Sequence, residues 1–259
     1  MGDFLMSVDF GTLLIVCALI FLAGFIDAIA GGGGLISLPA YLIAGLPPHS
    51  AIGTNKFSAC FGTFVTTWHF AKCGFINWLY AIPAIITALI GSWIGAELAL
   101  LVSSDSFKVI MLIVIPLTAW WVLRKRSLNS DKQAFSATKT ILIITGLALS
   151  IGIYDGFYGP GTGTFLMLLL TGVAHISLNE AAGMTKAINL STNIAAVAVF
   201  LYNGVVYFPL AIVAAVFGIA GNYIGAKYFT RKGTGFVKPV IIVVLTIFFI
   251  KVCLELLQF

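Results

Sequence analysis

The chain has 259 residues, of which 60% are hydrophobic and only 9% are charged. A soluble domain carries about 25% charged residues, so this composition excludes the ordinary soluble classes and indicates an all-α polytopic membrane protein in a lipid bilayer. The net charge of +5 does not indicate a nucleic-acid partner, because the basic residues gather in two short loops.

Eight apolar runs are long enough to cross a bilayer, which takes about 20 helical residues. They cover roughly 12–30, 51–71, 76–102, 107–123, 140–157, 183–203, 206–228 and 236–257. Two shorter runs cover roughly 35–45 and 164–174. Eleven helical residues reach only about 16 Å, so we expect each short run to be a half-helix that forms a broken hairpin with the long helix before it.

The hairpins are marked by an acidic residue followed by glycines. Asp27 precedes Gly31-Gly32-Gly33-Gly34, and Asp155 precedes Gly159-Pro160-Gly161-Thr162-Gly163. Glycine and proline are the residues that most readily break a helix, and a carboxylate in an apolar span is costly. Two such breaks with the same layout indicate an internal repeat.

The rest of the chain follows the same repeat. Asn55-Lys56 corresponds to Thr185-Lys186, and Gly91 and Gly95 correspond to Gly221 and Gly225, at an offset of 130 residues, whereas the Asp-to-Gly regions are offset by 128. We therefore predict a first transmembrane repeat over 1–123, a basic linker over 124–139 and a second repeat over 140–259. Each repeat would hold one broken hairpin and three transmembrane helices, giving about eight full spans and two half-helices.

The charges predict the orientation of the repeats. Both basic segments, 124–139 and 227–238, should lie in the cytoplasm by the positive-inside rule. An even number of crossings must then separate them, so the second repeat enters the membrane from the opposite face, and both termini lie outside. Inverted repeats with discontinuous helices are typical of secondary transporters, whose substrate sits where the halves meet.

At these residues the chain resembles the sulfite exporter TauE/SafE family of membrane transporters. The resemblance rests on Gly24-Phe25-Ile26-Asp27 through the four glycines to Pro39, on Gly53-Thr54-Asn55-Lys56, and on the second-half echo from Gly159-Pro160-Gly161 to Lys186. It covers essentially the whole chain. It implies a carrier of a small anion, typically sulfite, a sulfonate or a related organosulfur compound, in the bacterial cytoplasmic (inner) membrane. Pro160 and Thr162 stand where the first break has glycine, so the two breaks are not equivalent.

The candidate substrate-binding residues follow the breaks, because the N-terminus of a short helix presents free N–H groups to an anion. They are Gly32, Gly33, Gly34, Asn55, Lys56, Gly161, Thr162, Gly163, Thr185, Lys186 and Asn189. The lysines, which we place in the first turns of their helices, would either pair with the anion or extend to the membrane surface. The polar residues would either bind an oxyanion or join helices to one another.

Asp27 and Asp155 have two readings. They could take up a proton coupled to transport or pair with the lysines when no substrate is bound. Alternatively, they could be structural and accept N–H bonds that the broken backbone leaves free.

The sequence therefore predicts a secondary transporter of a small anion that works by alternating access. An anion channel with a pore lined by the two broken helices is the alternative. We expect no enzyme activity, no metal and no cofactor, since no helix carries paired catalytic carboxylates or a metal-binding spacing. The sequence leaves a homo-oligomer open.

Overall fold

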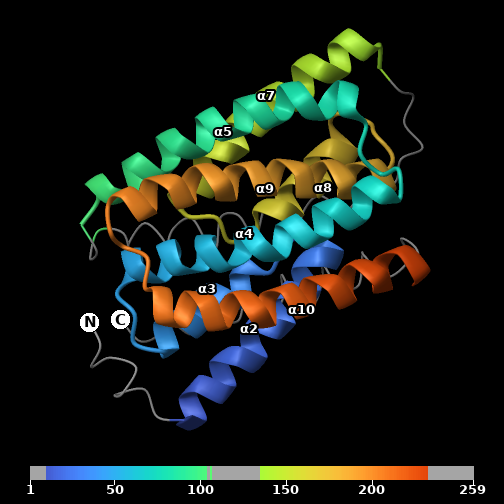
Figure 1. Cartoon of the computed structure of the whole chain (residues 1–259). Helices are drawn as coiled ribbons and strands as arrows, with labels where there is room; N and C mark the ends of the chain where they lie inside the picture. Colours follow the sequence, from blue (N-terminus) through green and yellow to red (C-terminus); the bar gives the residue numbers. More distant parts are fainter. Residues whose placement is uncertain (1–9, 104–105, 107–134, 233–259) are drawn as a thin grey trace, which may run out of the picture.

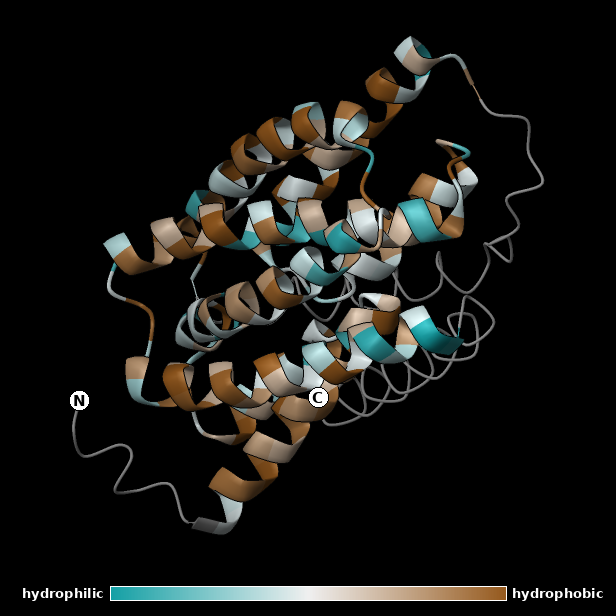
Figure 2. Cartoon of the chain, turned by 45° about the vertical axis from the view of Figure 1, so that its right-hand side comes forward, coloured by the Kyte–Doolittle hydropathy of each residue, from teal (hydrophilic) through white to brown (hydrophobic). Residues whose placement is uncertain are grey.

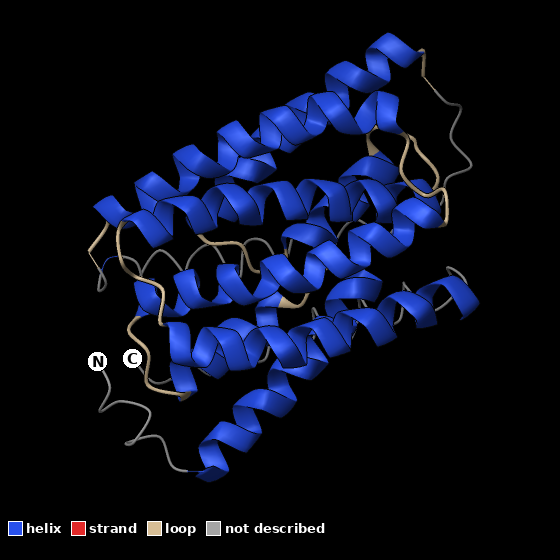
Figure 3. Cartoon of the chain, in the orientation of Figure 1, coloured by secondary structure: helices blue, strands red, loops and turns tan. Residues whose placement is uncertain are grey.

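The computed structural model describes residues 10–103, 106 and 135–232, and this part of the chain is entirely helical apart from its loops (Figures 1 and 3). The first half contains α2 (Phe10–Ala30), α3 (Gly34–Ile43), α4 (Pro48–Lys72) and α5 (Trp78–Leu101). The second half contains α7 (Ala137–Phe157), α8 (Thr162–Gly172), α9 (Leu178–Tyr202) and α10 (Phe208–Lys232).

These helices confirm the all-helical membrane class. Five of them are long and apolar enough to cross a membrane: α2, α5, α7, α9 and α10. The remaining long helix, α4, has 25 residues but carries more polar side chains. The two short helices, α3 and α8, have 10 and 11 residues and follow the glycine breaks as expected.

Several sequence predictions fall outside the described residues. They are the spans at 107–123 and 236–257, most of the basic linker 124–139, the end of the basic segment 227–238, and both terminal segments. The count of eight full spans therefore stays a prediction.

The long helices α4 and α9 lie at the centre of the bundle, between the α5–α7 pair and the α2–α10 pair (Figure 1). They run antiparallel. A Cβ built on Gly53, near the start of α4, would lie 3.2 Å from a methyl group of Val205, just beyond the end of α9. Conversely, Gly183 near the start of α9 packs directly on the backbone of Phe75, just beyond the end of α4. Corresponding positions of the two halves thus make corresponding contacts.

The outer helix pairs are joined by glycines. A Cβ on Gly95 of α5 would overlap the carbonyl oxygen of Ile153 on α7, and a Cβ on Gly225 of α10 would overlap that of Phe25 on α2. Small residues let helix backbones approach closely, which is the main route to tight packing in a membrane. Gly95 and Gly225, which correspond in the repeat, therefore serve close helix packing in both halves.

Large apolar side chains point away from these seams. On α5 the exposed residues recur every three or four positions, whereas the buried face consists of alanine, glycine and serine. The exposed set is Trp78, Leu79, Ile82, Ile86, Ile90, Trp93, Ile94, Leu98 and Leu101. Such an outward apolar face suits contact with lipid, since only small residues fit between the helices. Figure 2 accordingly shows hydrophobic residues, coloured brown, along the helices.

Apart from a central pair, the lysines and arginines of the described part gather at one end of the bundle. His69 Nε2 on α4 lies 3.2 Å from Thr230 Oγ1 on α10, so the ends of these helices, with Lys72 and Arg231, lie together. The parallel course of α5 and α7 brings Lys139 to the same end. Apart from the buried Lys56 and Lys186, every lysine and arginine of the described residues lies there.

Candidate functional site: a central cavity at two helix breaks

The two glycine breaks meet in the middle of the bundle. Gly31, with φ +74°, lies so close to the second break that a Cβ on it would overlap the backbone of Gly163. A Cβ on Gly34 would lie 3.1 Å from the Cα of Pro160. Only glycine permits both the left-handed conformation and this approach at position 31. Two segments 128 residues apart in sequence thereby form one structural unit.

Carbonyl groups at the breaks have hydrogen-bond donors supplied by side chains. Thr164 Oγ1 donates to the Ala30 carbonyl at 2.9 Å, Tyr154 OH donates to Pro160 at 2.7 Å and Thr162 Oγ1 donates to Gly159 at 2.7 Å. These hydroxyls replace the helical N–H groups that the breaks remove.

The N–H groups that open the short helices are in the opposite situation. Within the described part of the chain, no hydrogen-bond acceptor lies against the N–H of Gly34 or of Gly163. Both are the kind of free donor that the start of a helix leaves unsatisfied, together with a partial positive charge. The carbonyl groups named above thus have donors, whereas these two N–H groups are free.

Two ion pairs, each with a buried lysine, cross between the halves. Lys56 Nζ on α4 lies 2.7 Å from Asp155 Oδ2 on α7, and Lys186 Nζ on α9 lies 2.6 Å from Asp27 Oδ2 on α2. Both lysine side chains are 3% exposed. Each lysine thus pairs with the aspartate of the other half, so exchange of the two halves converts one ion pair into the other.

The burial of the lysines corrects part of the sequence prediction. Neither lysine extends its ammonium group to the membrane surface. Both lie in the third turn rather than the first, because α4 begins at Pro48 and α9 at Leu178. Ser177 caps α9 by accepting the Glu180 N–H at 3.3 Å. The helix therefore begins before its apolar run, and its first turn contains polar residues. A charged side chain this deep requires a partner, and the aspartates supply it.

Asp27 combines the two roles that the sequence left open. Its Oδ2 pairs with Lys186, and its Oδ1 accepts the Gly33 N–H of its own break at 3.3 Å. The same carboxylate therefore accepts a hydrogen bond from the broken backbone and pairs with a lysine of the other half.

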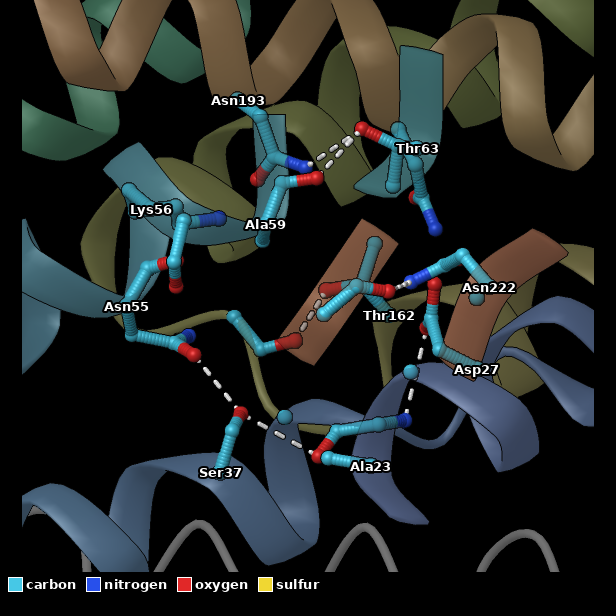
Figure 4. Close-up of a pocket in the computed structure, with 18 of the residues that line it drawn as sticks. Ala23, Asp27, Ser37, Asn55, Lys56, Ala59, Thr63, Thr162, Asn193 and Asn222 are labelled. Atoms are coloured by element: carbon cyan, nitrogen blue, oxygen red, sulfur yellow. Dashed lines mark hydrogen bonds between the residues drawn. The ribbon is translucent and has the colours of Figure 1, made fainter. Parts of the chain in front are cut away.

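Beside the breaks lies a cavity of about 620 Å³, its open mouth included. Its walls come from both breaks and from α2, α3, α4, α7, α9 and α10, and Figure 4 shows the polar side chains that face it. The charged and polar lining residues are Asp27, Ser37, Asn55, Lys56, Ser58, Thr63, Asp155, Thr162, Asn189, Asn193 and Asn222. The remaining wall is small or apolar: Ile20, Ala23, Gly24, Gly31, Gly33, Gly34, Ala59, Gly159, Gly163 and Gly218.

Most of the predicted substrate-binding residues line this cavity, but four do not. Gly33, Gly34, Asn55, Lys56, Thr162, Gly163 and Asn189 line it, together with both aspartates. Gly32, Gly161 and Thr185 are absent from its wall, and Lys186 lies behind Asp27. Three of these four residues belong to the second half of the chain.

The sequence did not identify all the lining residues. Ser37, Ser58, Thr63 and Asn222 were not among the predicted binding residues, although each is a polar residue within an apolar helix. Asn222 offered a signal, since it directly follows Gly221 of the repeated glycine pair. Its amide sits between α2 and α4, where Nδ2 would lie 2.9 Å from a Cβ on Gly24, and Oδ1 accepts from Thr66 Oγ1 at 2.9 Å.

Long apolar helices, broken in the middle around a polar cavity with two buried lysines, define the class of polytopic membrane transporters. The chain belongs to the family described as Sulfite exporter TauE/SafE, whose profile matches residues 16–252.

Relatives agree with this assignment. A Sinorhizobium sp protein named "Probable membrane transporter protein ORF9" is 36% identical over 224 residues, covering 86% of this chain and 85% of its own. A Haemophilus influenzae protein named as a probable membrane transporter is 33% identical over 242 residues, covering 92% and 93%. An Escherichia coli K12 protein named "Probable membrane transporter protein YfcA" is 32% identical over 224 residues, covering 86% and 82%. No solved structure matches the chain.

Proposed function

We propose that this protein is a secondary transporter of a small anion, namely sulfite, a sulfonate or a related organosulfur compound. The anion binds in the central cavity between the two breaks. The observation that carries this proposal is the concentration of donors there: the Lys56 ammonium group and the free N–H groups of Gly34 and Gly163 all border the same cavity. Helix N-termini and a buried lysine together favour an oxyanion.

The ion pairs give binding a consequence for the rest of the molecule. An anion that binds Lys56 displaces Asp155, which lies 2.7 Å from the lysine. The freed carboxylate is then buried without a partner, a costly state, and we expect it to take up a proton or to move. Because Asp155 belongs to the other half of the chain, binding loosens a bond between the halves.

We further propose that the halves are inverted-topology repeats, residues 1–123 and 140–259, that rock about the breaks between inward- and outward-open states. The antiparallel course of α4 and α9, which occupy equivalent places in the two halves, supports this arrangement. So does the exchange symmetry of the two ion pairs. We place the protein in a bacterial inner membrane with its basic end in the cytoplasm.

The test is transport by the purified protein in proteoliposomes. Labelled sulfite, a sulfonate, thiosulfate and sulfate are offered in turn, with and without imposed pH and voltage gradients. We expect saturable flux of at least one of the sulfur oxyanions. No flux of any anion under any gradient would remove the proposal, and single-channel currents would replace the carrier with a channel.

A further inference from the structure

The two halves line the cavity unequally, although the repeat gives each lining residue a counterpart in the other half. Gly33, Asn55 and Lys56 of the first half line it. Their second-half counterparts, Gly161, Thr185 and Lys186, do not. An exact repeat would present both sets or neither, so the difference must arise from the side chains around them.

Two substitutions between the halves account for this difference. Ser37 of α3 corresponds to Phe165 of α8, whose ring carbons would lie 3.5 Å from a Cβ on Gly161. The same ring packs edge-on against Tyr154 with centroids 5.6 Å apart. Phe165 therefore covers the second break at the place where the first break is open to the cavity.

The second substitution lies one turn further along the short helices. Tyr41 OH and Ser58 Oγ are joined by a hydrogen bond of 2.6 Å between α3 and α4. Their counterparts on α8 and α9 are Leu169 and Ile188, both buried. The first half thus has a polar junction beside the cavity where the second half has an apolar one.

Ser37, the first of the two substituted positions, fixes the orientation of Asn55. Ser37 Oγ donates to Asn55 Oδ1 at 2.6 Å and also lies 3.2 Å from the Gly33 carbonyl (Figure 4). With its oxygen held, the amide turns Nδ2 away from α3, and within the described residues Nδ2 has no acceptor. Asn55 is 8% exposed, lines the cavity and directly precedes Lys56. Two N–H donors are thereby held in the wall of the same cavity that the Lys56 ammonium group lines.

We propose that Asn55 is the residue that selects the transported anion, that Ser37 positions it, and that the second-half counterparts Phe165 and Thr185 make no contact with the substrate. This inference rests on the proposed function, since it concerns the same cavity. A rigidly held amide donor favours an anion with an oxygen atom beside the one bound by Lys56, because an unpaired buried donor would penalise any other ligand.

The experiment measures uptake into proteoliposomes for the sulfur oxyanion that gives saturable flux with the wild type. Asn55→Thr installs the side chain of the second half and should raise KM by roughly tenfold or more, the loss expected for a hydrogen bond to a charged group. Ser37→Ala should raise KM by a smaller factor at unchanged kcat, and Ser37→Thr, which keeps the hydroxyl, should restore KM. Thr185→Val should change KM less than twofold.

Thr171→Val is the control for removing a buried hydroxyl. Thr171 lies on α8 and bonds only to carbonyls of its own helix, at 2.7 Å from Met167 and 3.3 Å from Leu168, so uptake should stay at the wild-type level. Equal effects of Asn55→Thr and Thr185→Val on KM, or an unchanged KM in Asn55→Thr, would overturn the inference while leaving anion transport intact. Absence of wild-type flux would instead remove the proposed function itself.

Discussion

At the scale of single residues, the cross-paired lysines and aspartates are the features that most need an explanation. A buried ion pair is a poor source of stability, because the cost of removing two charges from water offsets their attraction. Two such pairs at equivalent places therefore indicate a function that needs charge inside the bundle. Breaking such a pair costs stability, whereas keeping it serves the function.

Lys56→Ala and the double variant Lys56→Met with Asp155→Asn distinguish these two effects. The single variant leaves Asp155 buried and unpaired, so we expect a loss of about 3–5 kcal/mol in the free energy of unfolding and no anion uptake. The double variant removes both charges and should recover most of the thermal stability in detergent, yet remain inactive in proteoliposomes. Wild-type uptake by the double variant would show that the pair is only structural.

The contact between the breaks can be tested at Gly31, with Gly74 as its match. Both glycines have a left-handed φ, +74° and +75°, but Gly31 touches the backbone of Gly163 whereas a Cβ on Gly74 meets nothing within 4 Å. Gly74→Ala should cost about 1 kcal/mol of stability from backbone strain alone. Gly31→Ala should cost more than that and abolish uptake, as measured by thermal unfolding in detergent and by proteoliposome flux. Equal losses would mean that the breaks need not touch.

At the scale of helices, stability comes from the close seams between α5 and α7 and between α2 and α10. In lipid there is no hydrophobic gain from burying an apolar side chain against another helix, so close packing of small residues takes its place. The alanine, glycine and serine face of α5 and its exposed tryptophan and isoleucine face follow directly from this rule. Each seam is fixed by a glycine at a position where the two backbones meet.

Gly95→Ala and Gly225→Ala should each weaken a seam, because the added methyl group would overlap the carbonyl oxygen of Ile153 or Phe25. Overpacking of this kind costs about 1–3 kcal/mol, to be measured by thermal unfolding in detergent. The matched control is Gly146→Ala on the exposed face of α7, where a Cβ meets nothing within 4 Å. It should leave stability unchanged or raise it slightly, since alanine is the better helix former. A loss in Gly146→Ala equal to that in Gly95→Ala would contradict the role of the seams.

The sequence predicts the helices well and the site only in part. Apolar runs and glycine breaks gave the number and order of the described helices, because hydrophobic length and helix breaking are local properties. The sequence places the starts of α4 and α9 several residues late, since the polar first turns that follow Pro47 and Ser177 are not typical of a membrane span. The partners of Lys56 and Lys186 could not be assigned, because a repeat offset equates positions without saying which of them meet in space.

At the scale of the whole molecule, the repeat and the charge distribution together predict how the two halves lie in the membrane. Corresponding glycine contacts, ion pairs and loops recur in the two halves, and equivalent central helices run in opposite directions. If the halves are inverted in the membrane, then any two equivalent loop positions lie on opposite faces. By the positive-inside rule, we expect the end of the described bundle that carries the lysines and arginines to be the cytoplasmic one.

Gly74 and Gly204 are equivalent loop positions that test this claim directly. Each follows the end of a central helix, has a left-handed φ (+75° and +66°) and leaves open space where a Cβ would lie. A cysteine should therefore strain both loops equally.

With the four native cysteines replaced by serine, a membrane-impermeant maleimide added to intact cells should label Gly204→Cys. Gly74→Cys lies at the basic end and should react only after the membrane is permeabilised. Labelling of both from outside would contradict the inverted repeat, and labelling of Gly74→Cys alone would keep the inversion but reverse the orientation, against the positive-inside rule. Because the two sites match in backbone conformation and surroundings, a difference in labelling can be attributed to the face of the membrane on which each loop lies.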